Sequence, residues 1–354
     1  MPNKILTYGL PLMAMLSTLS PAPLSALEPR TQPWRQVSIA GVDYVSLAEV
    51  MAFYDLKLQA QANSALRYAN PCTSVVLDEH MPFILMDGVA VKLLHPLRKD
   101  GLGEQLIAKQ DCIHMLDPIL RPHAIRPQWT LRRVVIDPCH GGVFQGVRAS
   151  ERAEKSALVL QLAQMLKARL ESQGFEVLLC RRDDYYVNPQ ERVDLANNTA
   201  DSMLIQLRLN DYNEQLGGIQ SYIAEPSDGR ATDGLNAALG MAVQSYLTVG
   251  TGFKDDGLRR VKHDMLSGIH VPAVCVALGN MGSPQQRLDL HDKAKQEATV
   301  SALQAAINAF AVAVAVPQEA TPEPVPEAEA TPTPTPEVEE IQAVASLQLE
   351  RSDE

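Results

Sequence analysis

The chain has 354 residues, 46% of them hydrophobic, and a formal net charge of −11 at pH 7. This length and composition suffice for one well-buried core and favour two. The acidic balance, and the lack of basic stretches interleaved with aromatic residues, exclude the common classes of nucleic-acid-binding protein.

Residues 1–26 have the composition of a secretory signal peptide. Lys4 and the amino terminus are positive, Ile5 to Leu19 are mostly apolar, and Leu24-Ser25-Ala26 offers a small-residue cleavage site. A membrane anchor is the alternative, but three prolines interrupt a stretch barely long enough to span a bilayer. We therefore expect an exported protein, located in the periplasm or the cell envelope.

The five cysteines are scattered and show no metal-binding spacing. Cys180 and Cys275 lie in apolar runs, which is typical of buried small hydrophobic residues. Cys72 and Cys112 could pair in an oxidising compartment, and the sequence leaves that pairing open.

Residues 34–123 predict a small α+β unit. The pattern indicates a hairpin around Gly41, a short helix capped by Ser46, a turn at Asp87-Gly88, and a short helix beginning at Ile107. This layout resembles the small stalk domain at the amino terminus of copper amine oxidases and on many bacterial cell-wall proteins.

Residues 132–311 alternate between strand and helix patterns. The alternation predicts an α/β domain with a mostly parallel sheet covered by helices on both faces. The strands are expected at 133–137, 175–180, 203–209, 219–223 and 273–278, and the helices at 151–173, 189–197, 233–249 and 293–310.

Residues 317–354 are rich in Pro, Glu, Thr and Ala, with ten acidic residues and one arginine. Such a segment cannot bury enough apolar surface to offset the entropy of ordering, so we expect a disordered acidic tail. The tail is either a solvated spacer or a site for an envelope protein partner.

Sites in open parallel sheets form at the carboxyl ends of the strands. The first strand of the α/β domain runs into Asp137-Pro138-Cys139-His140-Gly141-Gly142, and Glu154 opens the helix that follows. A histidine at a strand end and a carboxylate in the next helix are suitable metal ligands. The strand at 203–209 places Arg208 and Asn210 at the same edge, and we expect both to be ligand-binding residues.

At these residues the chain resembles the zinc-dependent N-acetylmuramoyl-L-alanine amidases, the cell-wall amidases of bacteria. The family's Asp-Pro-Gly-His-Gly-Gly stretch corresponds to residues 137–142, and its Glu-Lys pair to Glu154-Lys155. Residues 181–201 echo the family's Arg-x-x-Asp, Arg and Ala-Asn run. The resemblance implies a zinc ion held by His140, Glu154 and a third histidine, with a catalytic glutamate in the last central strand.

Two of the implied residues are replaced. Arg208 stands where the family has its third zinc ligand, and Ala277 stands where the family has its catalytic glutamate. An arginine keeps its proton and cannot coordinate a cation. We therefore predict a pseudoenzyme in which Arg208 fills the space of the ion and pairs with Glu154. No cofactor is expected, and zinc would bind only if the family activity is retained.

Other residues could restore or extend the site. His263 or His270 could supply a replacement ligand, and Asp211 or Glu214 a displaced base, although loop residues of these types are usually just solvated. Three residues of the loop at 185–188 could line a sugar- or peptide-binding groove, or could simply pack over the sheet edge, which we favour. They are Tyr185, Tyr186 and Asn188.

The sequence thus predicts an exported protein that binds peptidoglycan or its fragments without efficient hydrolysis. One alternative is a working amidase that cleaves the bond between N-acetylmuramic acid and L-alanine. The other is a protein–protein scaffold that uses the first unit and the acidic tail. Fold alone does not choose among them.

Overall fold

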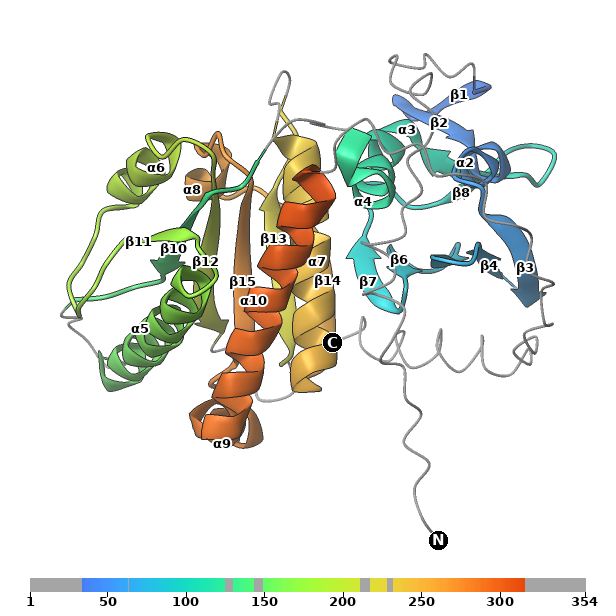
Figure 1. The fold of residues 1–354 in the computed structure, drawn as a ribbon. Helices are drawn as coiled ribbons and strands as arrows, with labels where there is room; N and C mark the ends of the chain where they lie inside the picture. Colours follow the sequence, from blue (N-terminus) through green and yellow to red (C-terminus); the bar gives the residue numbers. More distant parts are fainter. Residues whose placement is uncertain are drawn as a thin grey trace, which may run out of the picture. The chain divides into compact units, whose positions relative to one another are not determined.

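The computed structural model describes residues 34–62, 64–124, 130–142, 149–210, 217–227 and 232–315. The predicted signal peptide and the predicted acidic tail lie outside these residues. The described chain forms two units, residues 34–112 and residues 113–315 (Figure 1).

The first unit consists of two antiparallel sheets, the short helix α2 (Leu47–Phe53) and the single helical turn α3 (Lys109–Asp111). The sheets have the strand orders β1-β2-β9-β8 and β7-β6-β5-β4-β3. Their strands are β1 (Gln36–Ile39), β2 (Val42–Ser46), β3 (Lys57–Ala62), β4 (Ala65–Ala69), β5 (Ser74–Asp78), β6 (Phe83–Met86), β7 (Val89–Lys92), β8 (Arg98–Lys99) and β9 (Gln105–Ala108).

The predicted turns and helix cap of the first unit are present. Asp87 and Gly88 join β6 to β7 with φ values of 51° and 83°, and the hairpin at Gly41 has the same left-handed pair. Two residues of positive φ form the tight turn whose twist matches that of the strands. The Ser46 side chain accepts a hydrogen bond from the Glu49 backbone N–H and caps α2.

The second half of this region differs from the prediction. Ile107 is not at the start of a helix but in strand β9, and the helical stretch begins at Lys109. The predicted unit extended to residue 123, whereas residues 113–124 group with the second unit. The helical stretch that begins at Lys109 comprises α3 (Lys109–Asp111), the π-helical turn η2 (Cys112–Leu116), α4 (Asp117–Leu120) and η3 (Pro122–Ala124). The assignment of the first unit as a stalk domain stays a prediction.

The second unit is built on a mixed sheet with the strand order β11-β10-β12-β15-β13-β14. β11, β10, β12 and β15 run parallel to one another, whereas β13 runs antiparallel to β15. The strands are β10 (Arg133–Pro138), β11 (Glu176–Leu179), β12 (Ser202–Asn210), β13 (Ile219–Ala224), β14 (Asp255–Val261) and β15 (Ala273–Asn280).

Helices cover both faces of this sheet, as predicted. α5 and α7 pack on one face, with α10 lying on them, and α6 and α8 cover the other face (Figure 1). The helices are α5 (Ala149–Glu171), α6 (Pro189–Asn197), α7 (Asp233–Thr251), α8 (Asp264–Ser267), α9 (Pro284–His291) and α10 (Lys293–Ala315). The predicted fold class is therefore confirmed, while β14, α8 and α9 were missed.

Apolar packing explains why these segments lie where they do. β15 is buried along its whole length, which is the expectation for a central strand covered on both faces. Among the described helices, α10 alone is long and apolar enough to cross a membrane. It packs against α5 and α7 through buried residues such as Leu303 and Ile307, as a core helix does.

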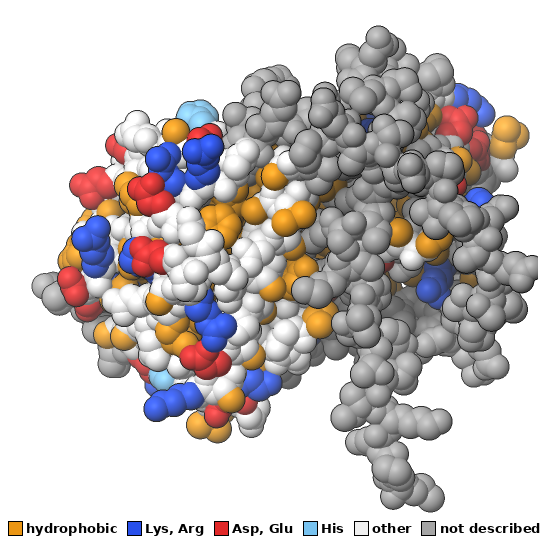
Figure 2. Space-filling view, in the orientation of Figure 1, with side chains coloured by type: hydrophobic (Ala, Val, Ile, Leu, Met, Phe, Trp, Pro, Cys, Tyr) orange, Lys and Arg blue, Asp and Glu red, His pale blue; other side chains and the backbone are white. Residues whose placement is uncertain are grey.

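The surface of the second unit carries charges of both signs. On the face shown in Figure 2, basic and acidic side chains are interspersed with apolar ones over α5 and α10. This mixture gives that face no extended field of one sign.

Candidate functional site

The loop after β10 has an unusual backbone. His140, Gly141 and Gly142 have φ values of 67°, 112° and 86°, so three successive residues lie in the region that glycine favours. A side chain at Gly141 would collide with the Tyr185 carbonyl oxygen and would lie 2.8 Å from the Arg181 Cδ atom. The two glycines therefore allow the loop to lie directly against the backbone of the segment after β11.

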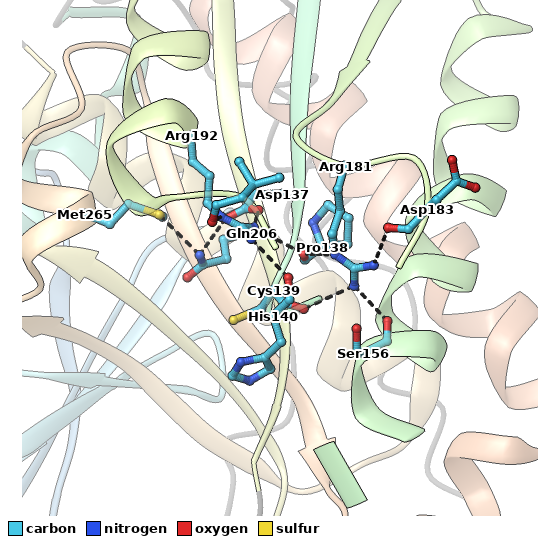
Figure 3. Close-up of polar contacts among 11 residues, drawn as sticks. Asp137, Pro138, Cys139, His140, Ser156, Arg181, Asp183, Arg192, Gln206 and Met265 are labelled. Carbon is cyan, nitrogen blue, oxygen red and sulfur yellow. Dashed lines mark hydrogen bonds and ion pairs between the residues drawn. The ribbon is translucent and has the colours of Figure 1, made fainter. Parts of the chain in front are cut away.

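Two buried arginines hold this loop through its carbonyl groups. Arg181 donates from Nε to the Pro138 oxygen (2.9 Å) and from Nη2 to the Cys139 oxygen (3.2 Å). Arg192 donates from Nη2 to the His140 oxygen (3.0 Å). Three consecutive carbonyls are thus held by guanidinium groups, and in Figure 3 the His140 ring points away from both. Burial lowers the pKa of Arg181, yet these neutral acceptors are those that a charged guanidinium satisfies well.

Asp137 anchors one side of the arrangement. Its carboxylate is fully buried, pairs with Arg192 and accepts a hydrogen bond from Gln206 Nε2 at 2.6 Å (Figure 3). A buried carboxylate needs such partners, because removal of one partner leaves an uncompensated charge that costs about 3–5 kcal/mol. The Asp-Pro sequence therefore has a structural role in fixing the strand end.

Arg208 and Ala277 lie side by side in the sheet. The parallel ladder between β12 and β15 pairs Arg208 with Ala277, and the antiparallel ladder pairs Ala277 with Gln220 of β13. Residues paired across neighbouring strands present their side chains to the same face. The guanidinium carbon of Arg208 lies 5.9 Å from the centroid of the Tyr222 ring, at the outer limit of a cation–π contact.

The two thiols on this face remain protonated. Burial raises the pKa of Cys275, and burial together with Asp137 raises that of Cys139, more than the nearby Arg208 lowers either. A thiol must lose its proton to bind a metal. Cys180 is also a buried residue, as predicted.

Glu154 does not pair with Arg208, so that prediction was wrong. Its carboxylate instead accepts hydrogen bonds from Arg287 (Nε, 3.0 Å) and lies 2.7 Å from His291 Nε2, both on α9. Partial burial acts to raise the pKa of Glu154, but the contacts from His291 and Arg287 outweigh it and lower the pKa. The retained carboxylate is therefore ionised and already occupied by two cationic or polar partners.

The residues present do not fit a catalytic zinc ion. Such an ion needs three protein ligands, and the resemblance drawn from the sequence puts Arg208, which cannot coordinate a cation, at the third position. Ala277 is fully buried and offers only a methyl group. Within the described parts of the chain, no group of three or more His, Cys, Asp or Glu side chains could hold a metal ion.

The alternative ligands are placed elsewhere or lie outside the described residues. The His263 ring caps the short helix α8, where its Nδ1 accepts from the Leu266 N–H, and His270 is exposed after that helix. Asp211 and Glu214 fall in the segment that the structure does not describe. The replacement histidine and the displaced base stay hypotheses.

Asn210 ends β12 at the same edge as Arg208. Its side chain is 7% exposed, and its Oδ1 atom has no hydrogen-bond partner among the described residues. A buried acceptor left unsatisfied costs about 1–3 kcal/mol, so such an atom is a suitable contact for a ligand N–H or O–H. The prediction that Asn210 binds a ligand is compatible with this geometry.

Sequence reasoning missed Arg287 and His291, which engage Glu154. The signal for their helix was available, because Ser283 followed by Pro284 is a typical helix start. The Ser283 side chain caps α9, and Pro284 occupies its first turn. What the sequence did not indicate is that this helix would lie against the start of α5.

The comparisons identify the family of the second unit. Residues 134–309 match the family described as N-acetylmuramoyl-L-alanine amidase. The second unit of this chain therefore belongs to that family, and the resemblance drawn from the sequence is confirmed.

Individual relatives are similar to about half of this chain. The chain is 28% identical over 200 residues to N-acetylmuramoyl-L-alanine amidase CwlM of Mycobacterium tuberculosis, over 52% of this chain and 49% of that protein. It is 29% identical over 149 residues to the sporulation-specific N-acetylmuramoyl-L-alanine amidase of Bacillus subtilis, over 42% of this chain and 55% of that protein. The chain thus spans about half the length of these relatives.

One solved structure is similar to part of this chain. An N-acetylmuramoyl-L-alanine amidase from Clostridium difficile 630 is 24% identical to this chain with a TM-score of 0.47, over 51% of this chain and 97% of that structure.

Proposed function

We propose that this chain is an exported member of the amidase family that binds peptidoglycan without efficient hydrolysis. One observation carries the proposal: the position of the third zinc ligand and the position of the catalytic glutamate hold Arg208 and Ala277, which are neighbours in one cross-strand pair. Both replacements thus fall at the same place in the site.

Each replacement removes a step of the family's chemistry. In the family's chemistry, a zinc ion would supply water activation and carbonyl polarisation, and a glutamate would carry the proton to the leaving amine. Arg208 cannot serve as a ligand, and its fixed positive charge opposes a divalent cation. Loss of a proton carrier alone commonly lowers the rate by about 10²–10⁴-fold.

Other features support retained binding. The loop 137–142 is kept in a defined conformation by Arg181 and Arg192. The edge of the sheet also presents Asn210, whose buried acceptor has no partner in the described chain. A domain that has lost its chemistry but keeps an ordered strand-end site is suited to binding the family's polymer.

The test uses the purified full chain and three measurements. These are the zinc content, the release of new α-amino groups from purified peptidoglycan with and without a chelator, and co-sedimentation with insoluble peptidoglycan. We expect co-sedimentation without release and less than stoichiometric zinc.

Two outcomes would overturn the proposal. One equivalent of tightly held zinc with chelator-sensitive release of amino-terminal L-alanine would establish a working amidase. Failure to sediment with the wall and failure to release amino groups would favour the scaffold.

A further inference from the structure

Two exposed tyrosines lie next to the strand-end loop. Tyr185 and Tyr186 are 45% and 66% exposed, and they are the only aromatic residues among the exposed large hydrophobic side chains of the described chain. The sequence-based preference was for packing over the sheet edge; in the structure the backbone of this segment lies against the loop after β10, and both tyrosines are exposed. Exposed rings at a candidate site are more informative than exposed aliphatic residues scattered over a surface.

The backbone that carries the tyrosines is fixed rather than loosely attached. Asp184 Oδ1 accepts hydrogen bonds from the Gly142 N–H (3.0 Å) and the Ser156 hydroxyl (3.1 Å). The Tyr185 N–H donates to the Asp183 oxygen at 3.0 Å, and Arg181 donates to that same oxygen. Rings held on an anchored backbone lose little conformational entropy when a ligand binds.

The location of the rings ties them to the site. A Cβ atom added to Gly142 would lie 2.8 Å from the Tyr186 backbone nitrogen, so the tyrosine backbone packs directly on the loop that carries His140. Any polymer lying along the carboxyl ends of β10 and β11 would therefore pass close to both rings.

The chemistry of the segment selects a neutral, amphipathic ligand. A tyrosine ring offers an apolar face and a hydroxyl edge at low entropic cost. Arg182, Asp183 and Asp184 beside it include two acids and one base, which gives no field for a polyanion. A pyranose ring with one CH-rich face and hydroxyl and acetamido edges matches this surface.

We propose that Tyr185 and Tyr186 form a stacking platform for the N-acetylated sugar rings of a glycan strand. This inference rests on the proposed wall-binding function and names the part of the wall that this site would hold.

The experiment compares the full chain with single variants by co-sedimentation with insoluble peptidoglycan. Tyr185→Ala and Tyr186→Ala are each expected to weaken binding about 3–10-fold, as loss of one aromatic contact does. Tyr185→Phe and Tyr186→Phe, which keep the ring, should bind within about twofold of the parent chain. Val312→Ala removes an exposed apolar side chain near the end of α10 and should leave binding unchanged.

A soluble N-acetylglucosamine tetramer should compete with the wall for the parent chain, and an isolated stem peptide should not. Alanine variants that bind like the parent chain, or competition by the stem peptide alone, would overturn the platform while leaving the wall-binding function intact. If the parent chain itself fails to sediment, the wall-binding function fails and the platform fails with it. Circular dichroism and the thermal midpoint confirm that each variant is folded.

Discussion

Arg208 in β12 and Ala277 in β15 are direct partners in the parallel ladder at the centre of the second unit. The two positions are 69 residues apart in the sequence, yet their side chains share one face of the sheet. A change at one therefore acts on the same small volume as a change at the other. This relationship is the reason to test them together rather than singly.

Restoring the two family residues together should restore more metal binding than restoring either one alone. We expect Arg208→His alone to bind zinc weakly and to release no amino groups, because Ala277 supplies no proton carrier. Arg208→His combined with Ala277→Glu should take up more zinc than either single variant. Turnover should nevertheless stay low, since Glu154 is engaged by Arg287 and His291. The measurements are zinc content after dialysis and amino-group release from peptidoglycan.

Adding Arg287→Ala to that pair tests the role of α9. Loss of the guanidinium leaves Glu154 with only His291, so zinc uptake should rise further. Equal zinc content with and without Arg287→Ala would show that the α9 contacts do not compete with the ion.

The contact between Glu154 and α9 should be visible in the pH dependence of stability. The folded-state pKa of Glu154 is lowered below 4.5, so its stabilising contribution is present above pH 4.5 and is lost as the pH falls through the folded-state value. Glu154→Gln should lower the free energy of unfolding by about 0.5–1 kcal/mol at pH 7, as expected for a partly exposed ion pair. Urea denaturation of both proteins at pH 7 and at pH 3 measures the difference.

The difference between the parent chain and Glu154→Gln should shrink toward zero at pH 3. Glu176→Gln is the matched control, because Glu176 forms a more exposed ion pair with Arg133 on the same unit. A constant deficit of Glu154→Gln across this pH range would contradict the ion-pair explanation.

Gly141→Ala should destabilise the second unit strongly. The new methyl group would meet the Tyr185 carbonyl and the Arg181 side chain, and the residue has a φ of 112°. Gly174→Ala is the matched control, since Gly174 has a φ of 92° with nothing within 4 Å of the added atom. We expect the control to cost about 1–2 kcal/mol from backbone strain alone and Gly141→Ala to cost at least about 3 kcal/mol. Equal costs in chemical denaturation would mean that the loop does not pack as described.

Asp87 in the first unit should behave as an acid that prefers its neutral form. Burial raises its pKa from 3.8 to about 6, although its Oδ1 accepts the Ser74 N–H at 2.8 Å. A folded-state pKa above the unfolded value means that the folded state binds the proton more tightly. Stability from this group is therefore present below pH 3.8 and is lost as the pH rises through 6.

Asp87→Asn should accordingly stabilise the first unit at pH 7 by roughly 1–2 kcal/mol, since each pKa unit corresponds to about 1.4 kcal/mol and solvent screening reduces the sum. Asparagine keeps the acceptor atom and tolerates the left-handed conformation that this turn position requires. Thermal unfolding at pH 7 and at pH 4 compares the two proteins. An advantage of the variant that is as large at pH 4 as at pH 7 would contradict the titration.

Local patterns were enough to predict most elements of the second unit. The apolar runs at 133–137 and 273–278 correspond to β10 and β15, and the leucines spaced by four along 158–170 correspond to α5. β14 was missed because its sequence begins Asp-Asp-Gly and is rich in arginine, so it lacks the alternation that marks a strand. The helical stretch at 109–120 was begun too early because Ile107 is an equally good strand residue.

The sequence by itself determined the fold class, the family of the second unit and the identities of the residues at the strand ends, since periodicity and motif spacing are local properties of the chain. Only the tertiary structure decided which partner satisfies Glu154, how Arg181 and Arg192 hold the carbonyls of the loop, and that Tyr185 and Tyr186 remain exposed. These outcomes depend on which surfaces meet when the helices pack on the sheet. A charged side chain pairs with a partner that lies close to it in the folded protein, and the order of residues along the chain does not by itself specify which residues come close.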